Sequence, residues 1–437
     1  KKSVTVTALD KSAYTGSTAP DLSSPKADKD YKVEGLVGAD TLSGTVTLTY
    51  EQTPDMSKTG KTAINITGTL SNDNYEITYV PGTLTVSKQP SSGGSSSGGG
   101  STSTGSGTVK TETTKNNDGS TTKTETKKDG TVIETTTGKD GSISKTETKK
   151  DGSSVTENKA ADGSTGTVKT DKNGQTEAAA KVSGKAVEDA KKNGEAVKVP
   201  VEVEATRNSS TAPTVSIELP KGAGETKVEI PVSNVTPGTV AVLVHPDGTE
   251  EILKDSIPTE DGIQLTVDGS ATVKIVDNSK GFIDTRNHWA EDEIDFVSAR
   301  GLVNGMSATI YAPNNSTTRA QLWTILARQA DADLTGGNTW YEKAQNWAKA
   351  KGISDGANPN AAINRAQMVT MLWRAMGQPT AGGTANFTDV PTDSYYAQAV
   401  AWAVENGITT GVGNGHFDPT GTCTRAQIAA FLARSMK

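Results

Sequence analysis

Three arginines recur in the last third of the chain, each at the start of a predicted amphipathic helix. They stand in the segments Thr318-Arg319-Ala320-Gln321, Asn364-Arg365-Ala366-Gln367 and Thr424-Arg425-Ala426-Gln427. A cation in the first turn of a helix opposes the helix dipole by a few tenths of a kcal/mol. Three such cations call for compensating anions, and two sources are open. One is an internal carboxylate, with Asp284 and Asp389 as candidates; the other is the carboxylate or phosphate of a ligand, which a guanidinium beside helix N-terminal amides binds well.

The same motif predicts where each helix begins. A Thr or Asn precedes each arginine and a Gln follows two residues after it, which is the pattern of a capping box. Apolar residues then recur at i, i+3 and i+4, giving one stripe per helix: Leu322, Ile325 and Leu326; Met368, Met371 and Leu372; Ile428, Phe431 and Leu432. Because one stripe cannot be buried alone, we expect these helices to pack about a pseudo-threefold axis.

Alignment of the three motifs by their arginines reveals a longer repeat of helix, loop and helix. In each copy an aromatic residue stands twelve positions before a glycine, and a proline stands six positions before the arginine. The aromatics are Trp289, Trp340 and Tyr395, and the glycines are Gly301, Gly352 and Gly407. At this spacing such aromatics are more often core than ligand-binding. The stretch from glycine to arginine is five residues shorter in the second copy, which predicts a degenerate binding groove there.

These residues resemble the S-layer homology (SLH) domain. The resemblance rests on Phe282-Ile283-Asp284, His288-Trp289-Ala290, the Gly-Leu/Ile-x-x-Gly loops, the proline and the Thr-Arg-Ala-Gln motif, over about residues 281–437. It implies a three-pronged trimer of repeats whose grooves bind a secondary cell-wall polysaccharide, commonly a pyruvylated one. By motif position it assigns polysaccharide contacts to Arg319, Arg365, Arg425, Asp284, Asp389, Trp289, Trp340 and Tyr395. Gln stands where most relatives have Glu, which removes a charge beside each arginine.

Residues 3–87 alternate apolar side chains with threonine, as in Val4, Val6 and Ala8, which predicts antiparallel β structure. The segments from Gly35 to Leu42 and from Gly68 to Val86 resemble the MBG modules found in tandem on bacterial surface proteins. The resemblance implies a small β-grasp-like spacer or adhesive module, and it brings no catalytic residues.

The middle of the chain is low in apolar residues and has an eleven-residue period. Residues 90–107 are mostly Ser, Gly and Thr, a composition typical of a flexible linker. Hairpin dipeptides then recur at Asp118-Gly119, Asp129-Gly130, Asp140-Gly141, Asp151-Gly152, Asp162-Gly163 and Asn173-Gly174. Both faces of the intervening strands would be polar, so a thin single-layer sheet and an extended, charge-balanced chain remain open. A short helix is predicted over residues 177–192, and stronger alternation over residues 197–276 predicts a β-sandwich-like domain.

The predicted fold is therefore multi-domain, with all-β N-terminal and central domains, a low-complexity repeat and linker between them, and an α-helical C-terminal pseudo-threefold trimer of SLH repeats. The predicted domains are an MBG-like module (1–88), a Gly/Ser linker (89–107), a repeat stalk with a short helix (108–194), a β-sandwich-like domain (195–280) and three SLH repeats (281–330, 331–378 and 379–437).

Composition excludes several classes of function. The net charge is −7 without a basic stretch, so we expect no nucleic-acid partner. Cys423 is the only cysteine and the three histidines lie far apart in sequence, so we expect no disulfide, metal or cofactor. No apolar run reaches membrane-spanning length. The chain begins at Lys1 without a signal region, which suggests a mature or truncated piece. No hydrolase, nucleotide or zinc-protease motif is present, so we expect no enzyme.

Two functions fit these observations. The leading hypothesis is non-covalent anchoring of an extracellular protein to the bacterial cell wall or S-layer through an acidic secondary cell-wall polysaccharide. The alternative is a surface adhesin or S-layer structural protein whose N-terminal β module binds host, matrix or neighbouring surface proteins.

Overall fold

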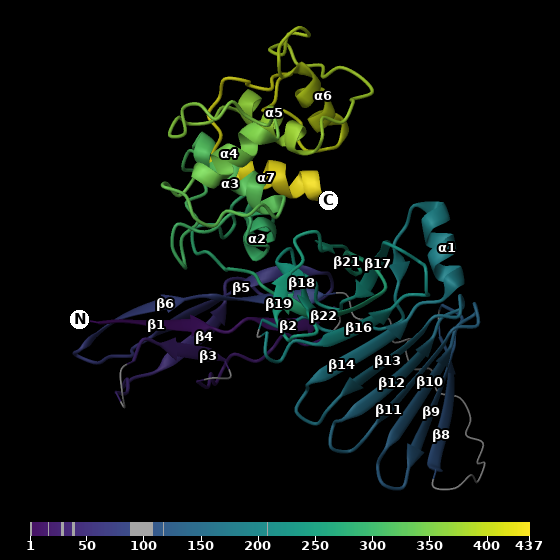
Figure 1. The fold of residues 1–437 in the computed structure, drawn as a ribbon. Coiled ribbons are helices and arrows are strands. Elements are labelled where there is room, and N and C mark those ends of the chain that lie inside the picture. The colour runs from purple at the N-terminus through teal and green to yellow at the C-terminus, as the bar shows by residue number, and fades with distance from the viewer. Residues whose placement is uncertain are drawn as a thin grey trace. The chain divides into compact units, whose positions relative to one another are not determined.

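The computed structural model describes residues 2–437 apart from residues 16, 28–29, 37–39, 88–107, 117 and 208. The predicted linker over residues 89–107 lies outside the described residues. The chain forms two compact units, the first built from the strands β1 to β7 and the second from the later sheets and all the helices (Figure 1).

The N-terminal unit is a pair of sheets around a small apolar core. One sheet has the order β3-β1-β6 and the other β2-β7-β5-β4. The strands are β1 (Lys2–Ala8), β2 (Lys11–Tyr14), β3 (Tyr31–Glu34), β4 (Val46–Tyr50), β5 (Gly60–Gly68), β6 (Tyr75–Val80) and β7 (Gly82–Ser87). The alternation predicted for β1 is confirmed, since Val4, Val6 and Ala8 are all buried.

The prediction that this unit is wholly antiparallel is wrong. β1 pairs with β6 and β2 pairs with β7 in parallel. The reason is the path of the chain, because β1 and β2 are consecutive but lie in different sheets, and so do β6 and β7. The two crossings run in the same direction, so each pair that they create is parallel.

The second unit begins with a sheet of eleven strands in the order β19-β18-β22-β16-β14-β13-β12-β11-β10-β9-β8. Its strands in chain order are β8 (Thr108–Lys115), β9 (Thr121–Lys127), β10 (Val132–Thr137), β11 (Ile143–Thr148), β12 (Ser154–Lys159), β13 (Thr165–Thr170), β14 (Thr176–Lys181), β16 (Thr214–Glu218), β18 (Thr239–Val244), β19 (Glu250–Ile252) and β22 (Ser270–Asp277). Of the two readings left open for the eleven-residue repeat, the structure shows the sheet.

The turns of this repeat explain its regularity. The six turn glycines from Gly119 to Gly174 have φ between 80° and 90°, the left-handed region that glycine adopts without strain. The aspartates before Gly130, Gly141, Gly152 and Gly163 each accept a hydrogen bond from the amide that follows the glycine. Asp140 Oδ1, for example, accepts hydrogen bonds from Ser142 N at 3.0 Å and from Ser142 Oγ at 2.6 Å. Each hairpin therefore sets its own register by local interactions.

A second sheet covers part of the first and encloses an aliphatic core, which matches the predicted sandwich-like domain. It consists of β15 (Val197–Lys198), β17 (Thr226–Pro231), β21 (Gly262–Val267) and β20 (Ile257–Pro258). The core includes Val199, Val215, Ile217, Ile230 and Ile263. The large sheet runs through the domain boundary predicted at residue 194, because β14 pairs in parallel with β16.

One helix, α1 (Gly184–Asn193), connects β14 to the second sheet. It starts later than the sequence predicts, because residues 176–181 are recruited into the sheet between β13 and β16. The Ser183 side chain caps its first turn by accepting from Ala186 N, and Gly194 ends it in the left-handed conformation.

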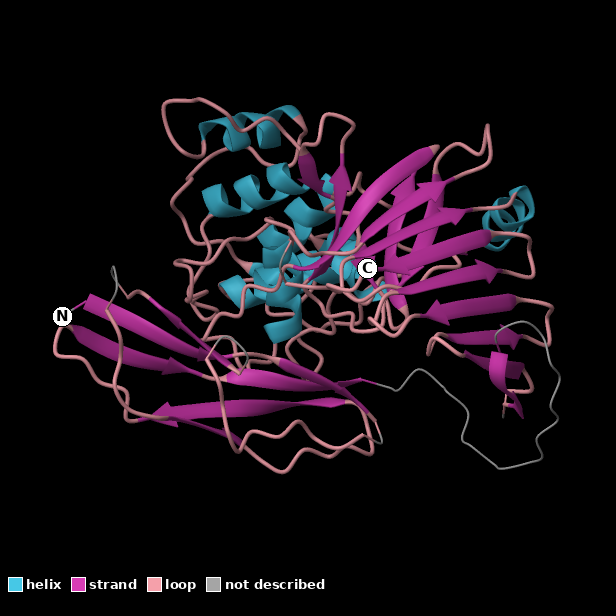
Figure 2. Ribbon diagram, turned by 90° about the horizontal axis from the view of Figure 1, so that it is seen from below, coloured by secondary structure: helices cyan, strands magenta, loops and turns pink. Residues whose placement is uncertain are grey.

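The remaining described helices follow residue 290, two in each repeat, and lie together in one group of helices (Figure 2). They are α2 (Glu291–Ala299) with α3 (Arg319–Gln329), α4 (Glu342–Ala350) with α5 (Arg365–Ala375), and α6 (Ala397–Glu405) with α7 (Arg425–Met436). All three predicted capping boxes are present. α4 packs on α3, α6 packs on α5, and α2 packs on α7, so the three pairs close into a ring.

A triangle of backbone hydrogen bonds marks the centre of this ring and confirms the predicted pseudo-threefold axis. Thr317 N donates to Cys423 O at 3.1 Å, Cys423 N donates to Ile363 O at 2.9 Å, and Ile363 N donates to Thr317 O at 2.9 Å. Each of these residues stands two positions before a motif arginine. The triangle therefore places the three helix starts around one axis.

One buried arginine, which no sequence pattern predicts, joins the ring to the β sandwich. Arg300 follows α2 and is 1% exposed. Its guanidinium donates to the carbonyl oxygens of Pro237, Thr239, Ser256 and Phe296 at 2.5–3.2 Å and lies over the Phe296 ring. Burial lowers the pKa of Arg300 to about 9, and nearby Asp255 opposes this shift.

Candidate functional site

The motif arginines lie between repeats, not on the surface of their own helices. Arg319 Nε donates to Ala357 O at 2.8 Å, Arg365 Nε donates to Phe417 O at 2.7 Å, and Arg425 Nε donates to Tyr311 O at 2.8 Å. Each acceptor is two positions before the proline of the next repeat, and the third arginine reaches back to the first repeat. We call each such contact a junction. At the junctions the arginines are only 4–8% exposed.

The helix N-terminal amides beside these arginines are already paired, so the expected receptor of unpaired amides is not present. Arg319 N donates to Ala361 O at 3.0 Å, and Ala320 N donates to Pro359 O at 2.9 Å. The same two bonds recur at the other junctions, from Arg365 N, Ala366 N, Arg425 N and Ala426 N. The capping boxes take up the next amides. The neighbouring repeat thus supplies the carbonyl groups that a free helix end would seek from a ligand.

The three junctions differ at one guanidinium nitrogen, Nη2. In the first junction Arg319 Nη2 donates to the Asp355 carboxylate and to Ser354 Oγ. In the third, Arg425 Nη2 donates to Asn304 O at 2.6 Å. In the second, Arg365 Nη2 is buried and has no hydrogen-bond partner among the described residues. Asn304 and Asp355 each precede a loop glycine, and the corresponding residue of the third repeat is Thr410.

Electrostatics separate the first junction from the other two. Arg319 forms an ion pair with Asp355, the single motif arginine for which the described residues show one. The Ala357 amide, and then Arg319, hold the pKa of Asp355 below its usual value. Burial lowers the pKa of Arg365. At the second junction the nearby Asp418 and Asp389 oppose this shift without pairing with Arg365. Of the two anion sources left open by the sequence, an internal carboxylate is therefore seen in an ion pair at the first junction only, among the described residues.

Asp284 and Asp389 shape the loops that receive the arginines. Asp284 accepts from Tyr311 N at 2.9 Å and from Ala312 N at 2.7 Å, and Asp389 accepts from Phe417 N at 2.8 Å and Asp418 N at 2.7 Å. Ala312 and Asp418 have φ of 60° and 58°, a left-handed conformation that is costly for residues with a Cβ. Each carboxylate therefore stabilises a strained loop. Among the described residues neither aspartate forms an ion pair with a motif arginine, but Asp389 lies close enough to Arg365 to raise its pKa.

The three repeated aromatics are exposed, so the reading that places them in the core is wrong. Trp289, Trp340 and Tyr395 are 59%, 64% and 60% exposed. They lie just before α2, α4 and α6, outside the helical spacing on which the core reading was based. Each has an aromatic neighbour at a ring-centroid distance of 5.0–5.5 Å: His288, Tyr341 and Tyr396 respectively. A large exposed ring in the same place in every repeat is typical of a ligand-binding surface.

The eight predicted contact residues thus fall into two groups. The aromatics face solvent, whereas the arginines and aspartates lie within the loops and junctions; their assignment as polysaccharide contacts stays a prediction. Asp355, which pairs with Arg319, was not predicted from the sequence. Its position in the shortened loop was the one feature that could have indicated it. Among the described residues no cluster of His, Cys, Asp and Glu suits a metal ion, and no helix has the length and apolar character needed to cross a membrane.

Cys423 lies at the axis and is buried with no exposed surface. Burial raises the pKa of its thiol to about 12. Because the thiolate is the reactive form, we expect native protein at pH 8 to resist a thiol reagent and to react fully once unfolded in guanidinium. The time course of absorbance with a chromogenic disulfide measures this. Rapid reaction of the native chain would contradict the burial of Cys423.

Comparison with known proteins agrees with this architecture. The family model of the S-layer homology domain matches residues 281–322 and 386–429, and that of the MBG domain (YGX type) matches residues 4–85. The chain therefore carries S-layer homology domains and an N-terminal MBG domain. The two SLH matches fall on the first and third helix pairs, and the second pair, with the shortened loop, lies between them.

Several curated proteins are similar to part of this chain. The S-layer protein sap of Bacillus anthracis is 30% identical over 172 residues, 35% of this chain and 20% of that protein. The amylopullulanase of Thermoanaerobacterium thermosulfurigenes is 33% identical over 173 residues, 35% of this chain and 9% of that protein. The surface-layer 125 kDa protein of Lysinibacillus sphaericus is 40% identical over 75 residues, 17% of this chain and 6% of that protein. The matches span at most a fifth of these relatives. The SLH and cell-surface matches place the chain outside the cell, anchored at the bacterial cell wall.

Proposed function

We propose that the chain is held at the wall by non-covalent binding of an acidic secondary cell-wall polysaccharide to its SLH repeats. The observation that carries this proposal is the threefold recurrence, within one closed ring of repeats, of an exposed aromatic ring and a buried inter-repeat arginine. Binding of this kind needs neither metal nor cofactor. The MBG domain and the large sheet then act as a spacer that presents whatever lies beyond them.

The aromatics supply the contact surface. A ring about 60% exposed, as at Trp289, Trp340 and Tyr395, offers a flat apolar face that a sugar ring can cover. The aromatic neighbours at 5.0–5.5 Å limit the motion of these rings, so little side-chain entropy is lost on binding. Three equivalent contacts on one rigid ring can engage successive units of one polymer, and such multivalency raises the apparent affinity.

The arginines supply the preference for an acidic polymer. A buried guanidinium without a counter-ion is costly, and a nearby anion lowers that cost. Among the described residues neither Arg365 nor Arg425 forms an ion pair, although Asp418 and Asp389 lie close enough to Arg365 to raise its pKa. Arg365 also keeps an unused donor at Nη2. These two junctions are therefore the ones at which we propose that an acidic substituent binds.

From the short loop in the second repeat, the sequence predicts a degenerate groove at that repeat's own arginine, Arg365. We propose instead that the degenerate groove is the one at Arg319. The loop from Gly352 to Arg365 receives Arg319 of the preceding repeat, because each arginine crosses to the next repeat. The short loop supplies Ser354 and Asp355, which saturate Arg319. The junction of Arg319, and not that of Arg365, is thus the one that we propose to be inactive.

A sedimentation assay on purified wall sacculi tests the proposal. We expect the full chain to sediment with intact sacculi and to remain in solution with sacculi whose secondary polymer has been removed by acid. A triple variant, Trp289→Ala, Trp340→Ala and Tyr395→Ala, should lose most of the binding to intact sacculi, because its substitutions remove exposed rings that support no core. Equal retention on intact and stripped sacculi would refute the polymer as ligand.

We propose no enzymatic activity for this chain. The amylopullulanase that it resembles is matched over 9% of its own length. No catalytic motif stands in this sequence, and the carboxylates at the start of α2, Glu291, Asp292 and Glu293, are explained by the helix dipole.

A further inference from the structure

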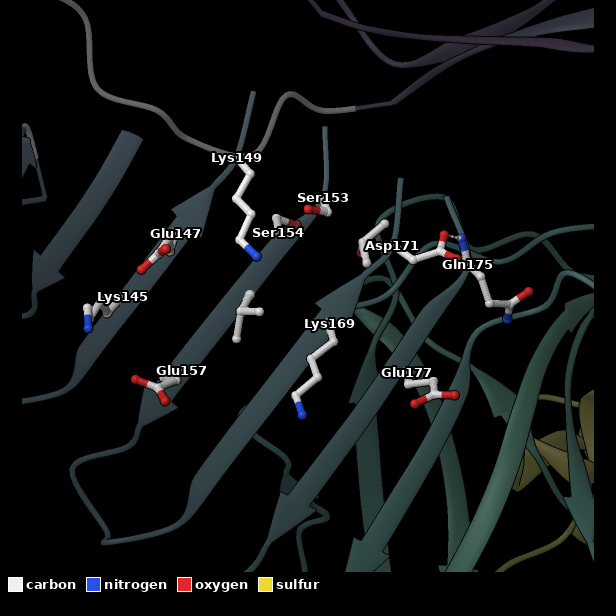
Figure 3. A pocket seen from close by; sticks show the side chains of 12 residues that line it. Lys145, Glu147, Lys149, Ser153, Ser154, Glu157, Lys169, Asp171, Gln175 and Glu177 are labelled. Carbon is white, nitrogen blue, oxygen red and sulfur yellow. Dashed lines mark hydrogen bonds between the residues drawn. The ribbon is translucent and has the colours of Figure 1, made fainter. Parts of the chain in front are cut away.

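The strands β8 to β11 are held together without an apolar core. Among the described residues from 108 to 177 no aliphatic side chain is buried, and the first buried one is Ala178 in β14. One face of the sheet carries charges, with Lys145 directly opposite Glu157 and Lys169 opposite Glu177 (Figure 3). The other face carries hydroxyl pairs, such as Thr122 with Thr136 and Thr146 with Thr156, at 2.8 and 2.9 Å.

The sheet becomes covered at β12 and β13. Asn158 Nδ2 donates to Pro200 O at 2.9 Å. A Cβ atom added at Gly166 would lie 2.0 Å from the same oxygen, so the backbone at Pro200 rests directly on this glycine. Beyond this point Ala178, Ala180, Val215 and Ile217 belong to the core of the sandwich. The part stabilised by hydrogen bonds and turns alone therefore ends between β11 and β12.

Tension applied along the chain acts first on this uncovered part of the sheet. Among the described strands, β8 lies at the edge of the sheet and has β9 as its single neighbour. The chain enters β8 at Thr108, and it leaves β14 toward the sandwich and the SLH ring. A pull between the two ends of the chain therefore acts on the open end of the β8–β9 hairpin and breaks its ladder one hydrogen bond at a time. Each detached strand exposes the next one to the same load.

We infer that β8 to β11 form a tension-release spacer, which unzips strand by strand when the chain is pulled and refolds when tension falls. The source of tension in the cell is the wall anchoring proposed above; the mechanical behaviour itself does not require it. Each repeat contacts only its neighbours, so opening stays local and refolding starts from the strand still in place. The Asp-Gly turns restore the register of each hairpin.

The length released is large compared with the folded width. Each strand adds about 4.8 Å to the width of a sheet. An extended chain spans at most about 3.5 Å per residue, so each eleven-residue unit can reach about 38 Å. Opening one unit should therefore lengthen the molecule by about 34 Å, and opening four units by about 130 Å.

Single-molecule pulling of the full chain between its two termini tests the inference. We expect reversible steps of about 3–4 nm at low force, before the larger cooperative events of the MBG domain, the sandwich and the SLH ring. A second measurement applies no force to the protein. Amide hydrogen exchange should be at least 100-fold faster in β9 to β11 than in β16 and β22. Opening of the whole eleven-stranded sheet in one event, or equal exchange in the two regions, would overturn the inference.

Two matched disulfide variants sharpen the pulling experiment. Thr122→Cys with Thr136→Cys links register partners in β9 and β10, whose hydroxyl oxygens are 2.8 Å apart. When oxidised, it should abolish the small steps of these two strands, and reduction should restore them. Ser216→Cys with Thr272→Cys links β16 and β22 in the covered part, where the oxygens are 3.1 Å apart, and should leave the small steps unchanged. An unchanged number of small steps after oxidation of the first pair would also overturn the inference. Binding to sacculi reports separately on the proposed anchoring.

Discussion

Replacement of Arg300 by alanine is expected to lower the free energy of unfolding by about 4 kcal/mol. The guanidinium donates to three buried carbonyl groups and to the half-buried Pro237 carbonyl, and it covers the Phe296 ring; alanine would remove all of these contacts. Because these carbonyls belong to the sandwich and to α2, the loss should appear as separation of the two. Denaturant unfolding followed by tryptophan fluorescence measures the energy, and limited proteolysis between residues 277 and 291 detects the separation.

The repeat itself supplies the control for this prediction. Lys351 occupies the position of Arg300 in the second repeat, one residue before the loop glycine, but it is exposed. Lys351→Ala should change the free energy of unfolding by no more than about 0.5 kcal/mol. Arg300→Lys keeps the charge, but one ammonium group cannot donate to four acceptors. Its loss in the free energy of unfolding should therefore lie between those of Arg300→Ala and Lys351→Ala. If Arg300→Ala changed the free energy of unfolding as little as Lys351→Ala, the contact of Arg300 with the sandwich would not contribute to stability.

Arg365→Ala is expected to weaken binding to wall sacculi by at least about ten-fold, and Arg319→Ala by much less. Loss of a hydrogen bond to a charged group costs about 1.5–3 kcal/mol, and 1.4 kcal/mol corresponds to a factor of ten in affinity. Arg365 has an unused buried donor, whereas Asp355 and Ser354 already occupy Arg319. Binding curves on sacculi of known polymer content measure the difference.

Both variants remove a bond between repeats, so folding must be checked independently. Denaturant unfolding followed by tryptophan fluorescence serves this purpose, and the buried thiol of Cys423 reports in addition on the packing at the axis. Each variant should keep Cys423 protected at pH 8. A ranking in which Arg319→Ala is the more damaging of the two, with Cys423 protected in both, would contradict the assignment of the inactive junction.

The helical region could be predicted from sequence because its signals are local. The capping boxes, the stripes at i, i+3 and i+4 and the spacing of aromatics and glycines all lie within one repeat. What could not be predicted is where each arginine points. Arg319 contacts a loop 38 residues away, at Ala357, and Arg425 contacts one 114 residues away, at Tyr311. Such contacts depend on how the repeats close, which no pattern within a single repeat encodes.

The β region shows the same division. Alternation located the strands of the N-terminal unit, but their direction depends on crossings between two sheets, so the parallel pairs were missed. For the eleven-residue repeat, periodicity gave the strands and turns. It could not decide between a sheet and an open chain, because both faces are polar and the usual signal of a buried face is absent. Hydrogen-bond ladders and turn geometry decide in favour of the sheet.

The backbone triangle of Thr317, Ile363 and Cys423 has a consequence for how this domain can change in evolution. An open solenoid gains or loses units at its ends, whereas these three repeats close on themselves, with α2 against α7. Deleting one unit would leave two unmatched surfaces, so the number three is fixed by closure. Moving the chain ends from one inter-repeat connection to another would keep every contact of the ring, so circular permutants should be admissible where truncations are not.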